Sequence, residues 1–216
     1  MKTLKIAVLV SGSGSNLQVM IDAMQAGRLP IEIVGVISNV ADAYAVTRAN
    51  DAGIRTVVLS HVPSGKKMGI KTFEKHALEL LHEWLPNLVV LAGFMRVLSA
   101  EFISGVPCPM INLHPSLLPY YKGLDTHERV LKAGDVLHGC SVHVVTPELD
   151  AGQVLTQAVL SVATSQTADS LRLRVQKLEH YVLPLTIELI IKGVIVLDGA
   201  DAVSSSPLPF RFYLDE

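Results

Sequence analysis

The chain has 216 residues, half of them hydrophobic and 18% charged, which is enough for one well-buried core. Its 18 basic and 20 acidic residues exclude the strong positive charge that is typical of proteins binding nucleic acid or anionic membranes. With 2 cysteines, the chain has too few for a disulfide scaffold. We therefore expect a single cytoplasmic domain without nucleic-acid or membrane partners.

Apolar runs alternate with amphipathic segments through the first half of the chain. This alternation predicts parallel strands joined by crossover helices. The Val, Ile and Leu content of the runs is typical of strands buried on both faces. The predicted fold class is α/β, a doubly wound and mostly parallel sheet in a single domain. The expected strands cover residues 6–10, 31–37, 56–59, 88–92 and 110–113.

The second half of the chain has a different pattern. Two strand-like runs, 141–145 and 153–162, flank a turn rich in Pro, Asp and Gly, which predicts a loop between two strands. The longest predicted helix covers 168–192, with Gly193 at its C-terminal cap and Pro184 expected to kink or break it. We expect the domain to cover residues 1–200 and a loosely held tail to cover 201–216.

A glycine-rich segment follows the first predicted strand and opens the first predicted helix. Glycines let backbone N–H groups approach an anion, and a helix N-terminus adds unpaired donors and a partial positive charge. A dinucleotide fingerprint would need glycine where this chain has Leu17. The alternative is a turn in which Ser15 or Asn16 caps the helix. The candidate phosphate-binding residues are Gly12, Ser13, Gly14, Ser15 and Asn16.

Asn112 and His114 lie two residues apart at the end of a predicted strand, directly before Pro115. Side chains at i and i+2 leave the same face of a strand, and ligands bind at the carboxyl ends of strands in open α/β sheets. The pair can polarise one carbonyl oxygen, although a structural histidine is the alternative. If the loop after Val145 folds over this strand end, we expect Asp150 to raise the pKa of His114 above its ordinary value.

Other polar residues give weaker signals. His127, His138 and His143 are candidate metal ligands, but no pair of them has the i, i+4 spacing of a helical zinc site. Ser116 lacks a Gly-x-Ser-x-Gly context, and Cys140 has no evident activating partner. We expect neither a catalytic metal nor a covalent nucleophile.

Several segments together resemble the glycinamide ribonucleotide formyltransferase family, which consists of folate-dependent enzymes of purine synthesis. The resemblance implies a Rossmann-like formyltransferase fold and no metal. It also implies transfer of the formyl group of 10-formyltetrahydrofolate to the amine of glycinamide ribonucleotide, in de novo purine (IMP) biosynthesis. The segments that carry it are 10–16, 89–96, 112–119, 139–143 and 149–152.

The resemblance also implies roles for individual residues. Asn112, His114 and Asp150 would be catalytic. The substrate phosphate would lie on Gly12, Ser13, Gly14, Ser15 and Asn16, with Gln176 and Glu179 contacting the rest of the substrate. Folate would contact Met95, Arg96, Val97, Leu98, Asn112, Thr146, Pro147, Glu148, Leu149 and Asp150.

Two positions depart from the pattern of this family. Lys122 stands where many relatives have proline. The segment 62–71 does not clearly supply an arginine for the glutamate tail of folate, so we expect Lys66, Lys67 or Lys71 to replace it.

Related and unrelated functions remain as alternatives. Formyltetrahydrofolate deformylase shares the Asn, His and Asp residues, but its N-terminal regulatory domain is not expected here, because the first strand begins near Leu4. Methionyl-tRNA formyltransferase would need an added C-terminal domain and a basic surface. A non-catalytic ligand-binding module is disfavoured by the intact Asn112, His114 and Asp150, and a nicotinamide oxidoreductase by Leu17. The sequence does not determine the oligomeric state.

Overall fold

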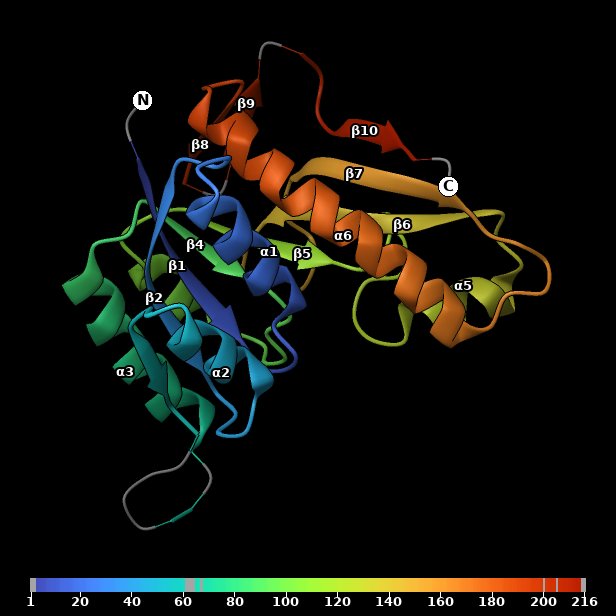
Figure 1. Ribbon diagram of the computed structural model, residues 1–216. Helices are drawn as coiled ribbons and strands as arrows, with labels where there is room; N and C mark the ends of the chain where they lie inside the picture. Colours follow the sequence, from blue (N-terminus) through green and yellow to red (C-terminus); the bar gives the residue numbers. More distant parts are fainter. Residues whose placement is uncertain (1–2, 61–64, 67, 200, 205, 215–216) are drawn as a thin grey trace. The chain divides into compact units, whose positions relative to one another are not determined.

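The computed structural model describes residues 3–60, 65–66, 68–199, 201–204 and 206–214 (Figure 1). Contacts within the chain group it into two compact units, Met1–Ile111 and Asn112–Glu216. Strands and helices alternate through the first unit, whereas an antiparallel strand pair and one long helix dominate the second. No helix within the described ranges is long and apolar enough to cross a membrane.

The first unit is built on parallel strands. Strand β1 pairs with both β2 and β4, and β2 pairs with β3, all in the parallel sense. Helices α1 and α2 contact each other beside these strands (Figure 1). The elements are β1 (Leu4–Val10), α1 (Ser15–Gln25), β2 (Ile31–Ser38), α2 (Tyr44–Asp51), β3 (Thr56–Val58), α3 (Ile70–Trp84), β4 (Leu88–Leu91) and α4 (Ala100–Gly105).

The core of the first unit follows from the apolar patterns. Residues Ile6 to Val10 of β1 are fully buried, as expected for a strand covered on both faces. On α3, Phe73, Ala77 and Leu81 recur at helical spacing and are also fully buried. Trp84 at the end of α3 packs on Gly35 of β2, where an added Cβ would lie 2.3 Å from the ring. Only glycine therefore fits at position 35.

The second unit combines β5, whose first residues belong to the other unit, with later strands and helices. Strands β6 and β7 are antiparallel, and β10 runs parallel to β7. Helix α6 packs across β6 and β7 (Figure 1). The elements are β5 (Met110–His114), α5 (Thr126–Ala133), β6 (Leu137–Val144), β7 (Val154–Ser161), α6 (Ala168–Ile191), β8 (Ile195–Asp198), β9 (Asp201–Ser204) and β10 (Phe210–Tyr213).

Two glycines allow the backbones of β6 and β7 to approach each other closely. A Cβ at Gly139 would lie 1.9 Å from the carbonyl oxygen of Ala158. A Cβ at Gly152 would lie 1.8 Å from the carbonyl oxygen of Val144. Both approaches are shorter than any side chain tolerates, so the backbone path at each end of this pair depends on glycine.

The α/β class with mostly parallel strands is confirmed, and the predicted strands and long helix are present. The expected break at Pro184 is wrong, because α6 continues through it. Buried residues on both sides of the proline, including Leu183 and Ile187, keep the helix packed against the sheet. Gly193 has the positive φ of 69° expected after the helix.

The C-terminal residues contain structure that the sequence did not predict. The expected loose tail holds β9, which pairs with β8, and β10, which pairs with β7. Both strands are 4 residues long and flanked by Ser, Pro and Asp, so their apolar alternation is too brief to be distinguished from a loop.

Candidate active site

Asn112 and His114 lie at the end of β5, as predicted. The Asn112 Nδ2 atom lies 3.1 Å from Nε2 of His143, a residue of β6. Nδ1 of His143 lies 2.9 Å from the carbonyl oxygen of Val144, which requires a hydrogen on Nδ1. In the neutral ring Nε2 then accepts a hydrogen bond from the Asn112 amide. His143 thus orients the Asn112 side chain.

Asp150 closes the cluster from the loop between β6 and β7. Its Oδ2 atom lies 3.4 Å from Nδ1 of His114, and its Oδ1 atom lies 3.6 Å from Nε2 of His143. The backbone N–H of Gly123 donates to Oδ2 at 2.9 Å. Asp150 is buried and has a φ of 48°, in the left-handed region that Asp and Asn tolerate better than most residues. The predicted approach of Asp150 to His114 is therefore present.

The segment after β5 supplies backbone groups to the same cluster. Nε2 of His114 lies 3.0 Å from the carbonyl oxygen of Tyr121. The Arg129 guanidinium donates to the carbonyl oxygens of Lys122 and Leu124 at 2.6 and 3.1 Å, which holds the turn containing Gly123. The Tyr121 carbonyl and the Gly123 N–H thus contact His114 and Asp150 from one ordered segment.

The expected raised pKa of His114 is wrong. Burial lowers the pKa of His114 below its ordinary value, with smaller lowering from the charges of His143 and Arg129. The Tyr121 carbonyl and the Asp150 charge both raise this pKa, as anticipated for Asp150, but they do not outweigh burial. The sequence could not show that the ring would be so completely removed from water.

The pKa of Asp150 moves in the direction that keeps it ionised. Burial alone would raise this pKa. The nearby His143 ring, the hydrogen bond from the Gly123 N–H and the charge of His114 lower it below its ordinary value. Both ring nitrogens of His114 face oxygen acceptors, Tyr121 O and Asp150 Oδ2, which is the arrangement that an imidazolium satisfies. The contacts of His114 thus favour an added proton, burial opposes it, and Asp150 is held ionised and able to accept a proton.

The glycine-rich segment of the first unit is an ordered loop at the start of α1. Gly14 precedes the helix with a φ of 69°, and an added Cβ would lie 2.6 Å from Cβ of Ala45. The alternative to an anion site, a helix cap by Ser15 or Asn16, is not observed, because Gly14 is the N-cap residue and no side-chain hydrogen bond caps the helix. Arg48 donates to the carbonyl oxygen of Ser13 at 2.9 Å, and the N–H of Ala45 to that of Gly12 at 3.1 Å.

The residues expected to contact folate fall in both units. In the first, Met95 and Val97 are 69% and 65% exposed, whereas Leu98 is buried. Arg96 lies over the Phe73 ring, and its guanidinium donates to the carbonyl oxygen of Met68 at 3.3 Å. Lys66 and Lys71 are among the described residues, whereas Lys67 lies outside them.

In the second unit, the predicted folate-binding loop lies beside Asp150. The Thr146 hydroxyl donates to the carbonyl oxygen of Glu148 at 3.2 Å, and Leu149 is half exposed. Nζ of Lys122, the residue expected to depart from the family pattern, lies 3.5 Å from the Glu148 carboxylate. A lysine side chain therefore contacts this loop.

Gln176 and Glu179 lie on α6 and are partly buried. Glu179 is close enough to β6 to act on Cys140, a fully buried residue. Burial raises the pKa of the Cys140 thiol well above its ordinary value, and the Glu179 charge raises it further. A thiol in this environment stays protonated and is not a nucleophile.

His143 is the member of the cluster that the sequence reading missed as a catalytic-site residue. His143 was noted only as a candidate metal ligand, and the register of β6 shifts between Val142 and His143, so simple alternation did not indicate its direction. His127 and His138 instead contact each other, with Nδ1 of His127 3.0 Å from Nε2 of His138. Within the described residues, no three His, Cys, Asp or Glu side chains are arranged to hold a metal ion.

Comparison with known proteins decides the family. The sequence model of the formyl transferase family matches residues 4–187. The chain belongs to this family. Among formyl transferases, it is 44% identical to the phosphoribosylglycinamide formyltransferase of Escherichia coli (strain K12) over 193 residues, which is 88% of each chain.

Two further formyl transferases extend the likeness over nearly the whole chain. The phosphoribosylglycinamide formyltransferase of Haemophilus influenzae is 36% identical over 213 residues, covering 98% of this chain and 99% of that protein. The solved structure of the enzyme from Coxiella burnetii, in complex with CHES, superposes with a TM-score of 0.88 at 43% identity. It covers 98% of this chain and 100% of that one.

Proposed function

We propose that this chain is a phosphoribosylglycinamide formyltransferase. It transfers the formyl group of 10-formyltetrahydrofolate to the amine of glycinamide ribonucleotide in de novo purine biosynthesis. The proposal is supported by family membership and by relatives of that name at up to 44% identity over most of the chain. The single structural observation that carries it is the meeting of Asn112, His114 and Asp150 at one strand end.

In the proposed reaction, the amine nitrogen attacks the formyl carbon and negative charge develops on the formyl oxygen. The bond from that carbon to the folate nitrogen then breaks, and the nitrogen leaves with a proton. The Asn112 amide gives one hydrogen to His143 and carries a second, which we assign to the developing oxyanion. A preorganised donor of this kind typically contributes about 3 to 4 kcal/mol.

His114 and Asp150 have the proton-handling roles. Tyr121 O and Asp150 Oδ2 face the two ring nitrogens of His114 and favour its protonated form, although burial opposes that form. We assign to the protonated ring a positive charge beside the oxyanion. Asp150 stabilises that charge and receives or relays the proton that the amine loses. The lowered pKa of Asp150 keeps it ionised as a proton acceptor near neutral pH.

The remaining site residues are assigned by the proposed substrates. We assign the substrate phosphate to Gly12, Ser13, Gly14, Ser15 and Asn16, because N–H groups at a helix start attract anions. Gln176 and Glu179 contact the rest of glycinamide ribonucleotide. Folate is assigned to Met95, Arg96, Val97, Leu98 and Asn112, and to Thr146, Pro147, Glu148, Leu149 and Asp150.

One assay separates this function from its rivals. The protein is incubated with 10-formyltetrahydrofolate, with and without glycinamide ribonucleotide, and tetrahydrofolate release is followed. A formyltransferase releases tetrahydrofolate only when the amine is present. Release without the amine would make the protein a deformylase, and no release in either case would make it a binding module.

The phosphate assignment has its own test by calorimetry. Asn16→Leu is expected to weaken glycinamide ribonucleotide binding and to leave folate binding nearly unchanged, because the side chain lies at the proposed anion site. Asn50→Leu, at an exposed position on α2, is the matched control and should change neither affinity. An equal loss of both affinities in a folded Asn16→Leu protein would remove the phosphate from this loop.

A further inference from the structure

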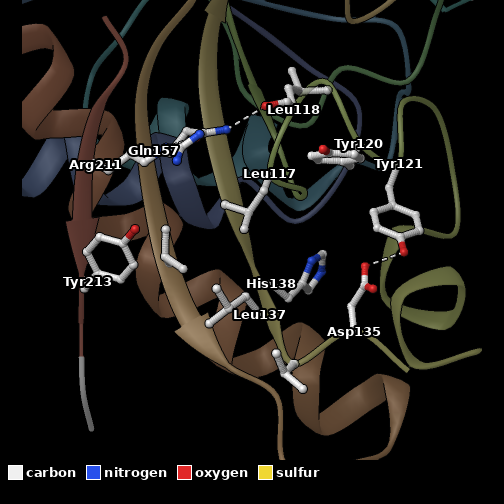
Figure 2. A pocket seen from close by; sticks show the side chains of 12 residues that line it. Leu117, Leu118, Tyr120, Tyr121, Asp135, Leu137, His138, Gln157, Arg211 and Tyr213 are labelled. Atoms are coloured by element: carbon white, nitrogen blue, oxygen red, sulfur yellow. Dashed lines mark hydrogen bonds between the residues drawn. The ribbon is translucent and has the colours of Figure 1, made fainter. Parts of the chain in front are cut away.

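A buried glutamine links the C-terminal strand to the segment that follows His114. Gln157 of β7 is 1% exposed, and its Nε2 atom donates to the carbonyl oxygen of Leu118 at 2.9 Å and to the Ser141 hydroxyl at 3.0 Å. Its Oε1 atom accepts a hydrogen bond from Nε of Arg211, also at 2.9 Å. Figure 2 shows Gln157 between Arg211 and Leu118. Both amide hydrogens and the amide oxygen therefore have partners.

Ser141 extends this link along the same segment. Its hydroxyl donates to the carbonyl oxygen of Ser116 at 2.6 Å and accepts from the N–H of Leu118 at 3.0 Å. A hydroxyl has one hydrogen, so with Gln157 as a second donor its capacity is filled. The segment from Ser116 to Leu118 is thus fixed at three backbone atoms by two buried side chains.

The far end of the segment touches the catalytic cluster. The Ser116 hydroxyl donates to the carbonyl oxygen of Tyr120 at 2.7 Å, which fixes the position of the next residue, Tyr121. The carbonyl oxygen of Tyr121 lies 3.0 Å from Nε2 of His114. Hydrogen bonds, joined by covalent steps within Ser116 and from Tyr120 to Tyr121, therefore connect Arg211 with the His114 ring.

Arg211 decides which way the Gln157 amide faces. An amide can turn over and exchange its oxygen and nitrogen, but a guanidinium is a donor only and selects the orientation with Oε1 toward it. The amide hydrogens then face Leu118 O and Ser141. Turned over, Gln157 would place its oxygen against the Leu118 carbonyl, and two acceptors would meet in a buried site.

Arg211 lies on β10, directly opposite Gln157 in the parallel register. It also lies outside residues 4–187, which match the family model. A cavity of about 460 Å³ is lined by Arg211, Gln157, Leu118 and Tyr121 among others (Figure 2). Loss of the guanidinium would leave the amide oxygen facing this cavity, without the donor that fixes its orientation.

We propose that Arg211 is a positioning residue for formyl transfer, which holds the Tyr121 carbonyl against His114 through Gln157, Ser141 and Ser116. The inference rests on the proposed function for its kinetic consequence. Its structural consequence, a hydrogen bond from His114 to Tyr121 that depends on Arg211, does not require any activity.

Steady-state kinetics of Arg211→Met test the kinetic consequence. We expect kcat to fall on the order of 10-fold, less than the roughly 10² of a 1 Å misplacement, with little change in either KM. Arg211→Lys restores a donor and a charge and should recover part of the loss. Tyr213→Leu is the matched control, because Tyr213 lies on the same strand and lines the same cavity (Figure 2). It should retain the wild-type kcat.

Titration of the His114 ring by NMR tests the structural consequence. The Tyr121 carbonyl raises the pKa of His114, so loosening it in Arg211→Met should lower that pKa further. The other charges that act on His114, Asp150, His143 and Arg129, are unchanged in the variant. If Arg211 only stabilised the fold, Arg211→Met would change the melting temperature and leave the His114 titration unchanged.

A double-variant cycle tests whether Arg211 acts through Gln157. In a Gln157→Leu background, Arg211→Met should cause no further loss of kcat or shift of the His114 titration, because the link is already broken. Gln157→Leu alone also keeps the proposal testable if Arg211→Met does not fold. An unchanged His114 titration in folded Arg211→Met, or additive losses in the cycle, would overturn the proposal. A wild type without formyl transfer would instead overturn the proposed function and leave the titration result standing.

Discussion

Two pairs of histidines in the second unit share low exposure but differ in their surroundings. His114 and His143 lie beside the Asp150 carboxylate, whereas His127 and His138 face each other. Burial lowers the pKa of His138 to about 4, helped by the charge of His127 and opposed by that of Asp135. Burial lowers the pKa of His114 as well, but a carbonyl and a carboxylate in contact with the ring oppose it. Contact with oxygen acceptors, rather than burial, separates a reactive imidazole from a structural one.

The His127–His138 pair is a neutral hydrogen bond between α5 and β6. The two ring nitrogens lie 3.0 Å apart, and the rings meet edge to face at 81°. One nitrogen must donate and the other accept, so the bond cannot persist when both rings are protonated. This pair is suited to holding two elements together near neutral pH and to failing in acid.

Substitutions of Asn112 and His114 test the cluster that these residues form with His143 and Asp150. Asn112→Ala and His114→Ala should each lower kcat by roughly 10² to 10³, as for loss of one oxyanion-stabilising group. The double variant should lose less than the product, because the two side chains serve one oxygen. Steady-state rates of the four proteins measure this, with His76→Ala as an exposed-histidine control. Fully multiplicative losses would mean that Asn112 and His114 act on different atoms.

Neutralising the Asp150 carboxylate should bring the pKa of His114 closer to that of His138. Asp150→Asn is expected to lower the pKa of His114, because the Asp150 charge raises it, and to lower kcat on the order of 10² through loss of the proton acceptor. Asparagine tolerates the φ of 48°, so the loop should keep its path. NMR titration of His114 in both proteins is the measurement. A pKa that stays or rises would separate Asp150 from His114.

As the pH falls, we expect the His127–His138 pair to be the first of the two histidine pairs to lose stability. The pKa of His138 is about 4 when folded and about 6.5 when unfolded, so the unfolded chain gains a proton first as the pH falls. Stability from neutral His138 is complete above pH 6.5 and declines by about 2 kcal/mol down to pH 5.

Denaturant unfolding across this pH range checks the prediction. His138→Gln should lose part of the acid dependence, although it gives up the bond to His127. His76→Gln, which removes an exposed imidazole, is the control. An acid dependence identical to wild type in His138→Gln would assign the effect to other groups.

The smallest effect is expected at Tyr121, whose backbone rather than side chain contacts His114. Tyr121→Phe removes the hydrogen bond from its hydroxyl to Asp135, 2.5 Å long and exposed, and leaves the carbonyl oxygen in place. We expect an unchanged kcat and His114 titration, with a slight loss of thermal stability. A large fall in kcat would show that the side chain, not the carbonyl, matters to the cluster.

The sequence predicted those parts of the site that depend on side-chain type and local spacing. Asn112 and His114 were found because two residues in a strand share a face. Asp150 was found as a carboxylate in a predicted turn, on the condition that the turn folds over that strand end. The parallel strands were found because buried runs of Val, Ile and Leu are distinctive.

Other features depend on contacts that no local pattern encodes. The Tyr121 carbonyl and Gly123 N–H are backbone groups, which every residue carries, so their role follows only from the path of the chain. The net direction of the His114 pKa depended on how fully the ring is buried. Strand β10 was missed because 4 residues give too short a pattern, and its partner lies more than 50 positions earlier in the chain.

Gly139 lies within β6 and Gly152 follows the turn that presents Asp150, and these two glycines limit which substitutions the protein tolerates. Neither position has room for a methyl group, since a carbonyl oxygen lies within 2 Å of where it would be. A saturation library should return only glycine at these two sites. Tolerated variation should therefore accumulate between them, at residues such as Glu148 and Leu149, whose side chains are exposed.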